Sequence, residues 1–360
     1  MWIRLESVRG ELVGEVTVSE NTQARRRDGG RPTMNDVARL AGVGLKTVSR
    51  VVNGEPRVSQ AMAEKVRAAI QELGYSPHEG ARLLRRGQTA CIGLVMEDVA
   101  NPFYSALAGA VEQTARANGF LLFTASSEED PAQERELSLA FCARRVDGLV
   151  IIPAAAADHR YLRPEIDAGV VTVFVDRPAV GIEADAVLAD NVGGTRAAVA
   201  HLLQHGHRRI GYIGDAAEIF TAAERLRGYR EELAGAGLAF DESLVAMGHP
   251  ELQFVHAALD RMLVGSEPVT ALIAGNNRAT VSVLRDLSTR HKQLALIGFD
   301  DFELADLLSP GVTVIAHDPT ALGKTAADLL FRRLQGYRGP VQTIEIATRL
   351  VPRGSGEIAR

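Results

Sequence analysis

Cysteine is scarce in this chain, which has Cys91 and Cys142 among 360 residues. Both have apolar neighbours, so we expect buried free thiols in a reducing cytoplasm rather than a disulfide framework. No run of about 18 apolar residues occurs, which argues against a membrane-spanning helix. Residues 1–30 mix Glu with Arg and lack the apolar segment of a secretory signal. The sequence therefore predicts a cytoplasmic protein.

Catalytic motifs are missing as well. There is no GxSxG, no P-loop and no GxGxxG opening a strand–helix unit, and Gly193-Gly194 is only a glycine pair. His201 and His205 have the spacing of one helical turn, with His207 beyond them, and could in principle bind a metal. No Glu or Cys set adjoins them, so we expect no metal, no cofactor and no enzyme.

Charge is distributed unevenly along the chain. The net charge is −5, yet residues 25–88 carry 13 Lys and Arg residues against six acidic ones. A basic N-terminal part on an acidic body suits a polyanionic partner at one end only. A length of 360 residues suggests about two or three domains.

The stretch TMNDVARLAGVGLKTVSRVVN, residues 33–53, predicts two short helices joined by a glycine-containing turn. Thr33 can cap the first helix with Asp36. The apolar positions expected to face inward are Val37, Ala38, Leu40, Ala41, Val48, Val51 and Val52. An ordinary structural hairpin of helices fits this stretch, but so does a helix-turn-helix whose second helix enters the DNA major groove.

A third helix is expected between Ser59, as its cap, and Gly74. Its predicted inner face consists of Met62, Val66, Ala69, Ile70 and Leu73. Residues 1–32 are expected to be a poorly ordered extension. The basic segment HEGARLLRRGQ that follows the third helix is too short for a stable isolated helix, so we expect it to order only against a partner.

From Ala90 onward, strands alternate with amphipathic helices, which is typical of parallel sheets covered on both faces. The pattern is too long for a single sheet, and two sheets would place a ligand cleft between their strand ends. The expected strands are Cys91–Met96, Phe120–Ala125, Gly148–Pro153, Val171–Asp176, Arg209–Gly214, Ala271–Ala274 and Leu294–Phe299.

Residues 33 to 356 resemble the lactose/galactose repressor (LacI/GalR) family of bacterial transcription factors. The resemblance rests on these motifs in this order: DVARLAGVGLKTVSRVVNGEPRVS, YSPHEGARLL, IGLVMEDVANPFYSALAGAVEQTARANG, VDGLVIIP, VDRP, HLLQHGHRRIGYIG, RLRGY, LIAGNN and ALIGFDD. It implies a small all-α helix-turn-helix headpiece and a two-lobed α/β body like a periplasmic binding protein. It also implies a homodimeric repressor that binds pseudo-palindromic, double-stranded operator DNA under the control of a small effector, most often a sugar.

The implied domain limits are 1–32 for the extension, 33–75 for the headpiece, 76–88 for a hinge and 89–360 for the effector-binding body. The first lobe would contain 89–189 and 318–337, and the second 190–317 and 338–360. A solute-binding protein, or a ligand sensor without specific DNA binding, is the alternative. The absent export signal and the basic headpiece argue against it.

The resemblance matches Leu45, Lys46 and Arg50 to base- and phosphate-contacting positions, and Leu84 to a leucine that wedges into the minor groove with Ala81 beside it. Thr33 and the polar residues of the second predicted helix are added to these positions. The predicted DNA-binding residues are therefore Thr33, Leu45, Lys46, Thr47, Ser49, Arg50, Asn53, Ala81 and Leu84.

The resemblance also implies effector contacts at strand ends and helix starts, where carboxylates, an arginine and an amide suit a hydroxyl-rich ligand. The predicted effector-binding residues are Phe103, Tyr104, Asp176, Thr221, Arg225, Asn276 and Asp300. Three residues depart from the family pattern: Gly44 replaces a capping serine, Gly80 a branched aliphatic residue, and Asn277 an aspartate.

Overall fold

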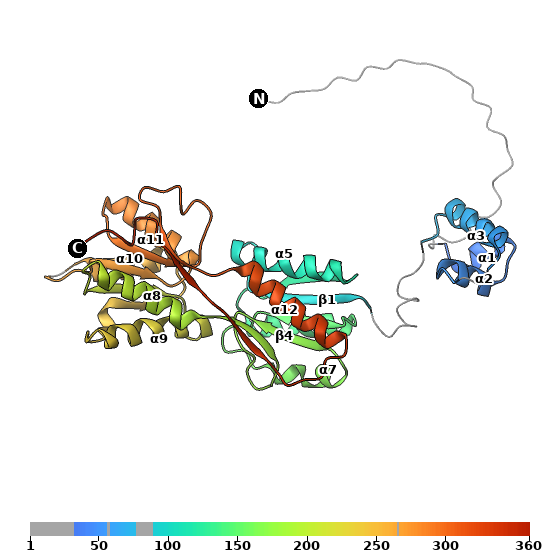
Figure 1. Ribbon diagram of the computed structural model, residues 1–360, viewed down its shortest axis with the longest axis horizontal. Coiled ribbons are helices and arrows are strands. Elements are labelled where there is room, and N and C mark those ends of the chain that lie inside the picture. Colours follow the sequence, from blue (N-terminus) through green and yellow to red (C-terminus); the bar gives the residue numbers. More distant parts are fainter. Residues whose placement is uncertain (1–31, 56–57, 77–88, 265) are drawn as a thin grey trace, which may run out of the picture. The chain divides into compact units, whose positions relative to one another are not determined.

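The structure, a computed structural model, describes residues 32–55, 58–76, 89–264 and 266–360. The chain divides into two compact units, an N-terminal headpiece and a larger body, and each is described by itself (Figure 1). The expected extension at 1–32, except residue 32, and the expected hinge at 76–88, except residue 76, lie outside the described residues.

The headpiece consists of three helices around a small apolar core. They are α1 (Met34–Ala41), α2 (Leu45–Val52) and α3 (Gln60–Leu73). The centre of the core is formed by Val37, Val48, Val66, Ala69 and Tyr75. Two residues expected to face inward do not: Leu40 and Met62 are 45% and 49% exposed. Three short helices enclose a small interior, so some apolar side chains of the predicted inner faces remain exposed to solvent.

The body contains two six-stranded sheets. The first-lobe sheet, in spatial order, is β11 (Thr343–Ile346), β5 (Asp185–Ala189), β4 (Val171–Val175), β3 (Gly148–Ile151), β1 (Cys91–Met96) and β2 (Leu121–Ser126). The second-lobe sheet is β12 (Arg349–Val351), β10 (Thr313–Ala316), β9 (Ala295–Phe299), β8 (Ala271–Ala274), β6 (Ile210–Gly214) and β7 (Val245–Met247). Among these pairings only that of β10 with β12 is antiparallel.

Helices cover both faces of each sheet, as the alternating pattern predicts. In the first lobe α5 (Pro102–Ala117) and α12 (Pro319–Leu334) cover one face, and α6 (Pro131–Ala143), η1 (His159–Leu162) and α7 (Arg163–Asp167) cover the other. In the second lobe α8 (Asn191–Gln204) and α9 (Phe220–Gly235) lie opposite α10 (Leu252–Leu263) and α11 (Asn277–Arg290). A short η2 (Glu242–Leu244) precedes β7.

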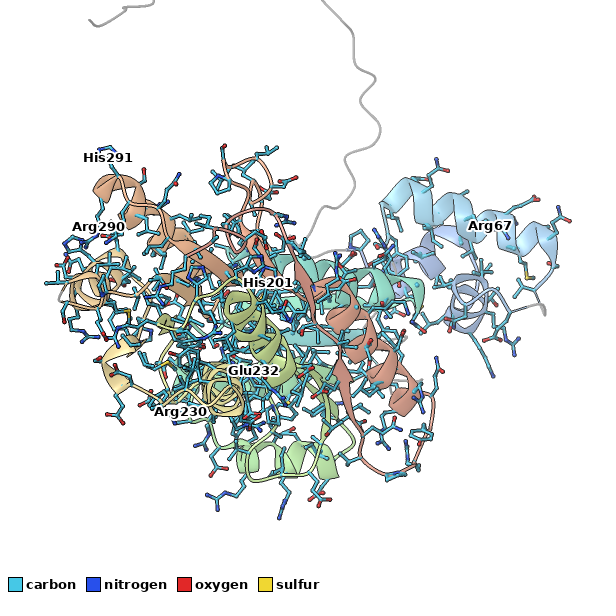
Figure 2. All side chains as sticks on the ribbon, turned by 60° about the vertical axis from the view of Figure 1, so that its left-hand side comes forward. Arg67, His201, Arg230, Glu232, Arg290 and His291 are labelled. Carbon is cyan, nitrogen blue, oxygen red and sulfur yellow. The ribbon has the colours of Figure 1, made fainter. Side chains whose placement is uncertain are left out.

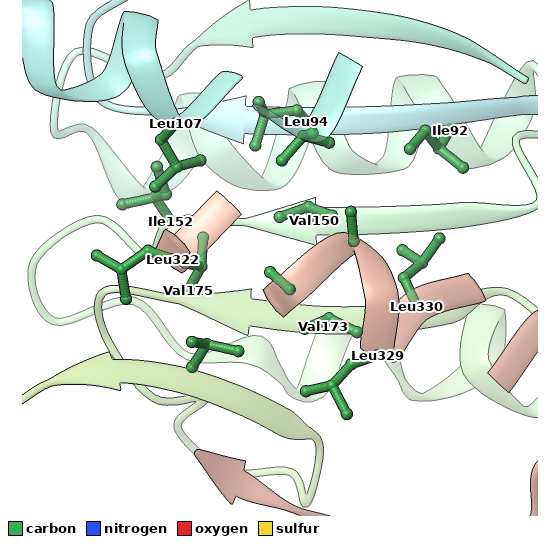
Figure 3. Close-up of a cluster of buried hydrophobic side chains, with 14 of the residues drawn as sticks. Ile92, Leu94, Leu107, Val150, Ile152, Val173, Val175, Leu322, Leu329 and Leu330 are labelled. Carbon is green, nitrogen blue, oxygen red and sulfur yellow. The ribbon is translucent and has the colours of Figure 1, made fainter. Parts of the chain in front are cut away.

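The first-lobe core joins parts of the chain that are far apart in sequence. Ile92 and Leu94 of β1 lie in one cluster with Leu322 and Leu330 of α12, and all four side chains are fully buried (Figure 3). This packing fixes α12, which comes late in the sequence, to the sheet that the early strands build.

The chain passes between the lobes after β5, after β10 and after β11. The last passage corrects an expectation, because residues 338–360 were assigned to the second lobe. Thr343–Ile346 instead pair in parallel with β5 of the first lobe, with Thr343 opposite Ala186. This edge strand alternates between exposed and half-buried residues, so it lacks the continuous apolar run that would identify it.

None of the described helices is long and apolar enough to cross a membrane. Among the described residues, neither Cys91 nor Cys142 forms a disulfide. Cys142 is buried, and burial raises the pKa of its thiol to about 11. Cys91 is only half-buried, which differs from the expectation.

Candidate functional site

The first helix of the candidate DNA-reading motif, α1, is held by local capping. The Thr33 backbone amide donates to Asp36 Oδ2 at 3.0 Å, and the Asp36 amide donates back to Thr33 Oγ1 at 3.4 Å. The Thr33 hydroxyl also donates to Asp36 Oδ2, at 2.7 Å. This bond and the one from the Thr33 backbone amide hold the pKa of the Asp36 carboxyl below its usual value. Gly42 ends α1 with a φ of +64°, which glycine adopts at little cost, and so turns the chain toward α2.

The outer face of α2 carries the predicted reading residues. Leu45 is 47% exposed and Lys46 is exposed, so both are accessible to a partner. Arg50 is half-buried, with Nε 3.7 Å from Glu55 Oε2. The Asn53 side chain donates from Nδ2 to Ser49 Oγ at 3.4 Å. An exposed apolar side chain and two cations along one short helix match the chemistry of thymine methyls, guanine acceptors and phosphates.

Two other parts of the DNA-binding prediction concern the start of α2 and the expected hinge. Gly44, at the start of α2, makes no side-chain capping bond, so the helix lacks the hydroxyl that a capping serine would supply. Ala81, Leu84 and Gly80 lie outside the described residues.

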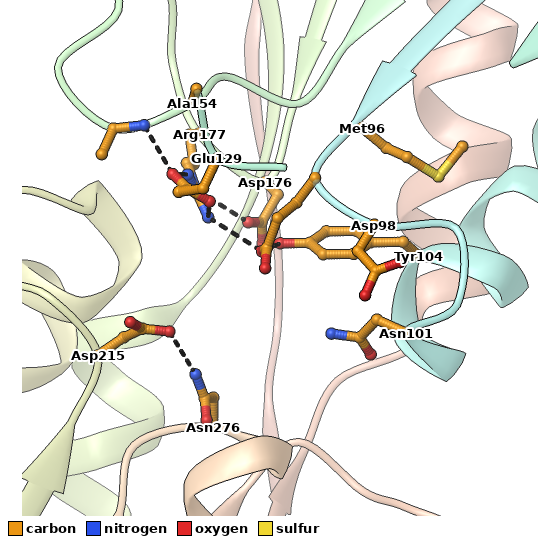
Figure 4. A network of polar contacts seen from close by, with 12 residues as sticks. Met96, Asp98, Asn101, Tyr104, Glu129, Ala154, Asp176, Arg177, Asp215 and Asn276 are labelled. Atoms are coloured by element: carbon orange, nitrogen blue, oxygen red, sulfur yellow. Dashed lines mark hydrogen bonds and ion pairs between the residues drawn. The ribbon is translucent and has the colours of Figure 1, made fainter. Parts of the chain in front are cut away.

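A pocket lies between the two lobes of the body. Its wall is formed at the carboxyl ends of strands β1, β4, β6, β8 and β9 and at the starts of the helices that follow, where ligands bind in parallel α/β folds. All seven predicted effector-binding residues belong to this wall: Phe103, Tyr104, Asp176, Thr221, Arg225, Asn276 and Asp300. Figure 4 shows side chains of both lobes facing one another here.

Arg225 and Asp300 form the second-lobe side of the pocket. Arg225 donates to Asn191 Oδ1 at 2.7 Å and to the Gly275 carbonyl at 2.6 Å, and its guanidinium lies 3.8 Å from the centre of the Phe299 ring. Its Nη1 is 3.6 Å from Asp300 Oδ2. The guanidinium is therefore fixed in position before any ligand arrives.

His317 lies behind Asp300, with Nε2 2.9 Å from Asp300 Oδ1. Burial alone would raise the pKa of Asp300, but the charge of Arg225 and the contact with His317 hold it below its usual value. Asp300 is therefore an ionised hydrogen-bond acceptor at neutral pH.

The first-lobe side is built on Asp176 and Arg177. Arg177 pairs with Glu129 and donates to the Pro153 carbonyl at 2.6 Å, while its Nε is 3.6 Å from Asp176 Oδ2 (Figure 4). Tyr104 donates its hydroxyl to Glu97 Oε2 at 2.9 Å. Burial raises the pKa of Tyr104 well above its usual value, so the hydroxyl keeps its proton.

Phe103 lies with its ring stacked on His317, at a centroid distance of 4.9 Å. Asn276 caps α11 by accepting from the Ala279 amide at 2.7 Å, and it donates to Asp215 Oδ2 at 2.9 Å. Asn276 thus has a structural role as well as a place in the pocket wall.

Sequence reasoning missed several charged or amide-bearing wall residues, namely Glu97, Arg177, Asp215 and Arg278, and left Asn277 doubtful. Asp215 follows β6 as Asp176 follows β4, so the rule of strand-end carboxylates could have found it. Glu97 directly follows β1, so the same rule could have found it as well. Arg278 gave no such signal, because it meets Glu97 only when the lobes come together.

The histidines whose spacing could suit a metal, His201, His205 and His207, do not line the pocket. His201 on α8 contacts Glu357 Oε1 at 2.5 Å, and its ring lies 4.5 Å from that of His205 (Figure 2). His207 contacts the Ile358 carbonyl at 2.8 Å. Within the described ranges, no group of three or more His, Cys, Asp or Glu side chains is placed to hold a metal ion.

Comparison with known proteins agrees with this arrangement. Residues 33–78 match the family described as bacterial regulatory proteins, lacI family, and residues 199–356 match a periplasmic binding protein-like domain. The transcriptional regulator CelR of Thermobifida fusca is 34% identical over 92% of this chain and 99% of its own length. The chain belongs to the lacI family. It is therefore a DNA-binding transcriptional regulator.

Solved structures of two family members are similar to this chain over most of its length. A complex of the transcriptional regulator CelR with cellobiose is 31% identical, with a TM-score of 0.66, and covers 91% of this chain and 100% of its own. The lac repressor dimer bound to operator and an anti-inducer is 25% identical, with a TM-score of 0.78, and covers 91% of this chain and 99% of its own. The headpiece and the two-lobed body expected from the sequence are thus confirmed.

Proposed function

We propose that this lacI-family member is a cytoplasmic, homodimeric repressor, and not an enzyme, whose operator affinity is set by an uncharged, hydroxyl-rich effector such as a sugar. The effector would bind in the pocket between the lobes. The observation that carries the proposal is the charge pattern of that pocket.

The pocket wall contains four carboxylates, Glu97, Asp176, Asp215 and Asp300, and three guanidinium groups, Arg177, Arg225 and Arg278. Each guanidinium lies within 3.6 Å of a carboxylate: Glu129, Asp300 and Glu97, respectively. An anionic ligand would meet carboxylates and no uncommitted cation in this wall. Sugar hydroxyls can donate to the carboxylates and accept from the remaining N–H groups, so they match the wall without adding charge.

Aromatic side chains complete this match. Phe103 lines the pocket with its ring, and a sugar ring can pack its apolar face on such a surface. The complex of the similar regulator CelR contains cellobiose, an uncharged sugar. This supports the class of ligand and leaves its identity to experiment.

For DNA recognition we propose that two copies of α2 read two half-sites of a pseudo-palindromic operator. Leu45 and Arg50 would reach the base edges. Lys46, Thr33, Thr47, Ser49 and Asn53 would hold the helix on phosphates, and Ala81 and Leu84 would contact the minor groove. The solved structure of the lac repressor is a dimer on its operator, which supports this arrangement.

Exposed apolar side chains on both lobes support a homodimer. Leu121 and Phe123 on the edge strand β2 are 61% and 41% exposed. In the second lobe Leu304 and Leu307 are 62% and 74% exposed. Contacts with a second copy on both lobes would remove these groups from water and would let a relative rotation of the lobes change the spacing of the two headpieces.

The test is operator binding by fluorescence anisotropy. The purified chain is titrated onto DNA from the region upstream of its own gene, at fixed salt, with a panel of neutral sugars and their phosphorylated counterparts. The proposal predicts binding to one palindromic segment and a shift in affinity with a neutral sugar only. A shift with a phosphorylated sugar alone would refute the proposed ligand class. Ligand binding without specific DNA binding would favour the alternative of a sensor.

A further inference from the structure

The two lobes are joined by a cluster of charges at the wall of the pocket. Arg278 is the second residue of α11 in the second lobe, and Glu97 and Asp98 directly follow β1 in the first. Arg278 Nη1 donates to Glu97 Oε1 at 3.0 Å, and Nη2 donates to Asp98 Oδ2 at 2.6 Å. One guanidinium thus bridges two consecutive carboxylates through one charge-assisted hydrogen bond to each.

A second contact across the lobes lies beside this one. Asn277 Nδ2 donates to Asn101 Oδ1 at 3.0 Å. The same Asn101 oxygen caps α5 by accepting from the Phe103 amide at 3.1 Å. The start of α11 therefore contacts the start of α5, the helix that brings Phe103 and Tyr104 to the pocket. Asp98, Asn101 and Tyr104 lie on the first-lobe side of Figure 4, opposite Asn276.

Each half of the charge cluster is unfavourable by itself. The start of a helix carries the positive end of its dipole, and α11 has no acidic residue in its first turn to offset Arg278. On the other side, burial and the charge of Glu129 raise the pKa of Glu97, whereas the charge of Arg278 lowers it. Glu97 also faces Tyr104 and Arg177, which lies 3.8 Å away. When the lobes come together, Arg278 and the carboxylates neutralise one another. This offsets the positive charge at the start of α11 and the negative charge that Glu97 shares with Glu129.

We propose that Arg278, Glu97 and Asp98 form a charge clasp that holds the two lobes closed and positions the effector pocket. Glu97 links the clasp to the pocket, because its Oε1 accepts from Arg278 and its Oε2 accepts from Tyr104. Arg278 is 45% exposed, so the clasp lies within reach of solvent ions and weakens at high salt. It is a positioning device, and its groups need not touch the effector.

The test reads the lobe distance in the full-length protein alone, so it depends neither on DNA nor on an effector. Spin labels are attached at Gln113→Cys on α5 and Lys292→Cys after α11, both exposed, with Cys91 and Cys142 replaced by Ala. Labelled chains are diluted with unlabelled chains to suppress distances between subunits. Pulsed electron resonance then gives the distribution of distances between the lobes at about 0.05 M and about 1 M NaCl, which differ several-fold in screening length.

In the unsubstituted background we expect one closed distance at low salt and a broader, longer distribution at high salt. Arg278→Gln should lower the ratio of closed to open forms about fivefold at low salt and remove the salt response. Asp98→Asn should act in the same direction, and adding it to Arg278→Gln should change little further, because both substitutions remove one contact.

The matched control is Arg285→Gln, which removes an exposed arginine from the same helix. It should leave the distribution unchanged. A distribution in Arg278→Gln that equals the background at both salts would overturn the proposal, as would an equal change in Arg285→Gln. Thermal unfolding of each variant separates opening of the lobes from loss of folding. Operator binding is measured separately, so failure of the clasp and failure of the proposed function remain distinguishable.

Discussion

Asp176 and Asp300 hold equivalent positions in the two lobes. Asp176 directly follows β4 and Asp300 directly follows β9, with left-handed φ values of +69° and +68°. The Asp176 amide donates to Val187 O at 2.8 Å and the Asp300 amide to Ile315 O at 2.9 Å, each on the neighbouring strand. A non-glycine residue in this conformation is strained, and such strain concentrates at functional sites. The same backbone conformation thus places one aspartate of each lobe at the wall of the shared pocket.

The first prediction concerns these two carboxylates. Asp176→Asn and Asp300→Asn keep the side-chain shape and replace one carboxylate oxygen with an N–H donor, so each should weaken binding of the active sugar about ten- to a hundredfold. Isothermal titration of the purified protein measures this. Asp301→Asn is the control, because its exposed carboxylate pairs with Arg353 at 2.7 Å instead of facing the pocket. Equal affinities in all three variants would remove the carboxylates from the effector site.

The second prediction concerns acid stability. Asp300 has a lowered pKa in the folded protein, held down against burial by Arg225 and His317. Its stabilising contribution is therefore complete above the unfolded pKa of about 3.9 and is lost as the pH falls through the lower folded value. The difference in unfolding free energy between the wild type and Asp300→Asn should shrink from pH 6 to pH 3. Urea unfolding of both proteins measures it, and a difference that grows toward low pH would contradict the assignment.

The third prediction separates base contacts from phosphate contacts on α2. If Arg50 reads a base, Arg50→Ala should weaken operator binding about ten- to a hundredfold and relax preference at one base pair. If Lys46 contacts a phosphate, Lys46→Ala should weaken all sequences alike and lower the salt slope by about one. Arg67→Ala, which removes an exposed arginine of α3, is the control (Figure 2). Unchanged affinity in Arg50→Ala would exclude this residue from the interface.

The fourth prediction concerns a close crossing of helices in the first lobe. A Cβ on Gly323 of α12 would lie 2.4 Å from the Leu107 carbonyl oxygen of α5, so Gly323→Ala must push the two helices apart. We expect a loss of about 1–3 kcal/mol of unfolding free energy. Gly109→Ala on α5 meets no atom within 4 Å and should instead stabilise by about 0.4–1 kcal/mol. Thermal unfolding of the two variants gives the sign of each effect.

Much of the fold could be predicted because the central strands are continuous apolar runs. Cys91–Met96 and Ala271–Ala274 were predicted with the bounds that the structure shows. The strands that escaped prediction, β5, β7, β10, β11 and β12, are three to five residues long and follow loops or alternate in exposure. Such segments take their conformation from the neighbouring strand, which the local sequence does not reveal.

The candidate site was predictable in part for a related reason. Asp176 and Asp300 stand where a buried strand ends, so position alone marks them. The pairing of Glu97 with Arg278 joins residues 181 positions apart across two lobes, and no periodicity or spacing encodes it. His317 likewise contacts Asp300 only because the chain passes between the lobes at that point.

Operator affinity with and without the active sugar, measured in the wild type and in Asp300→Asn, decides whether the pocket between the lobes controls DNA binding. We expect the sugar, at a concentration near its wild-type dissociation constant, to shift the operator affinity of the wild type and barely to shift that of Asp300→Asn. Both proteins should bind the sugar-free operator alike. A sugar response that persists unchanged in Asp300→Asn would show that the pocket between the lobes does not control DNA binding.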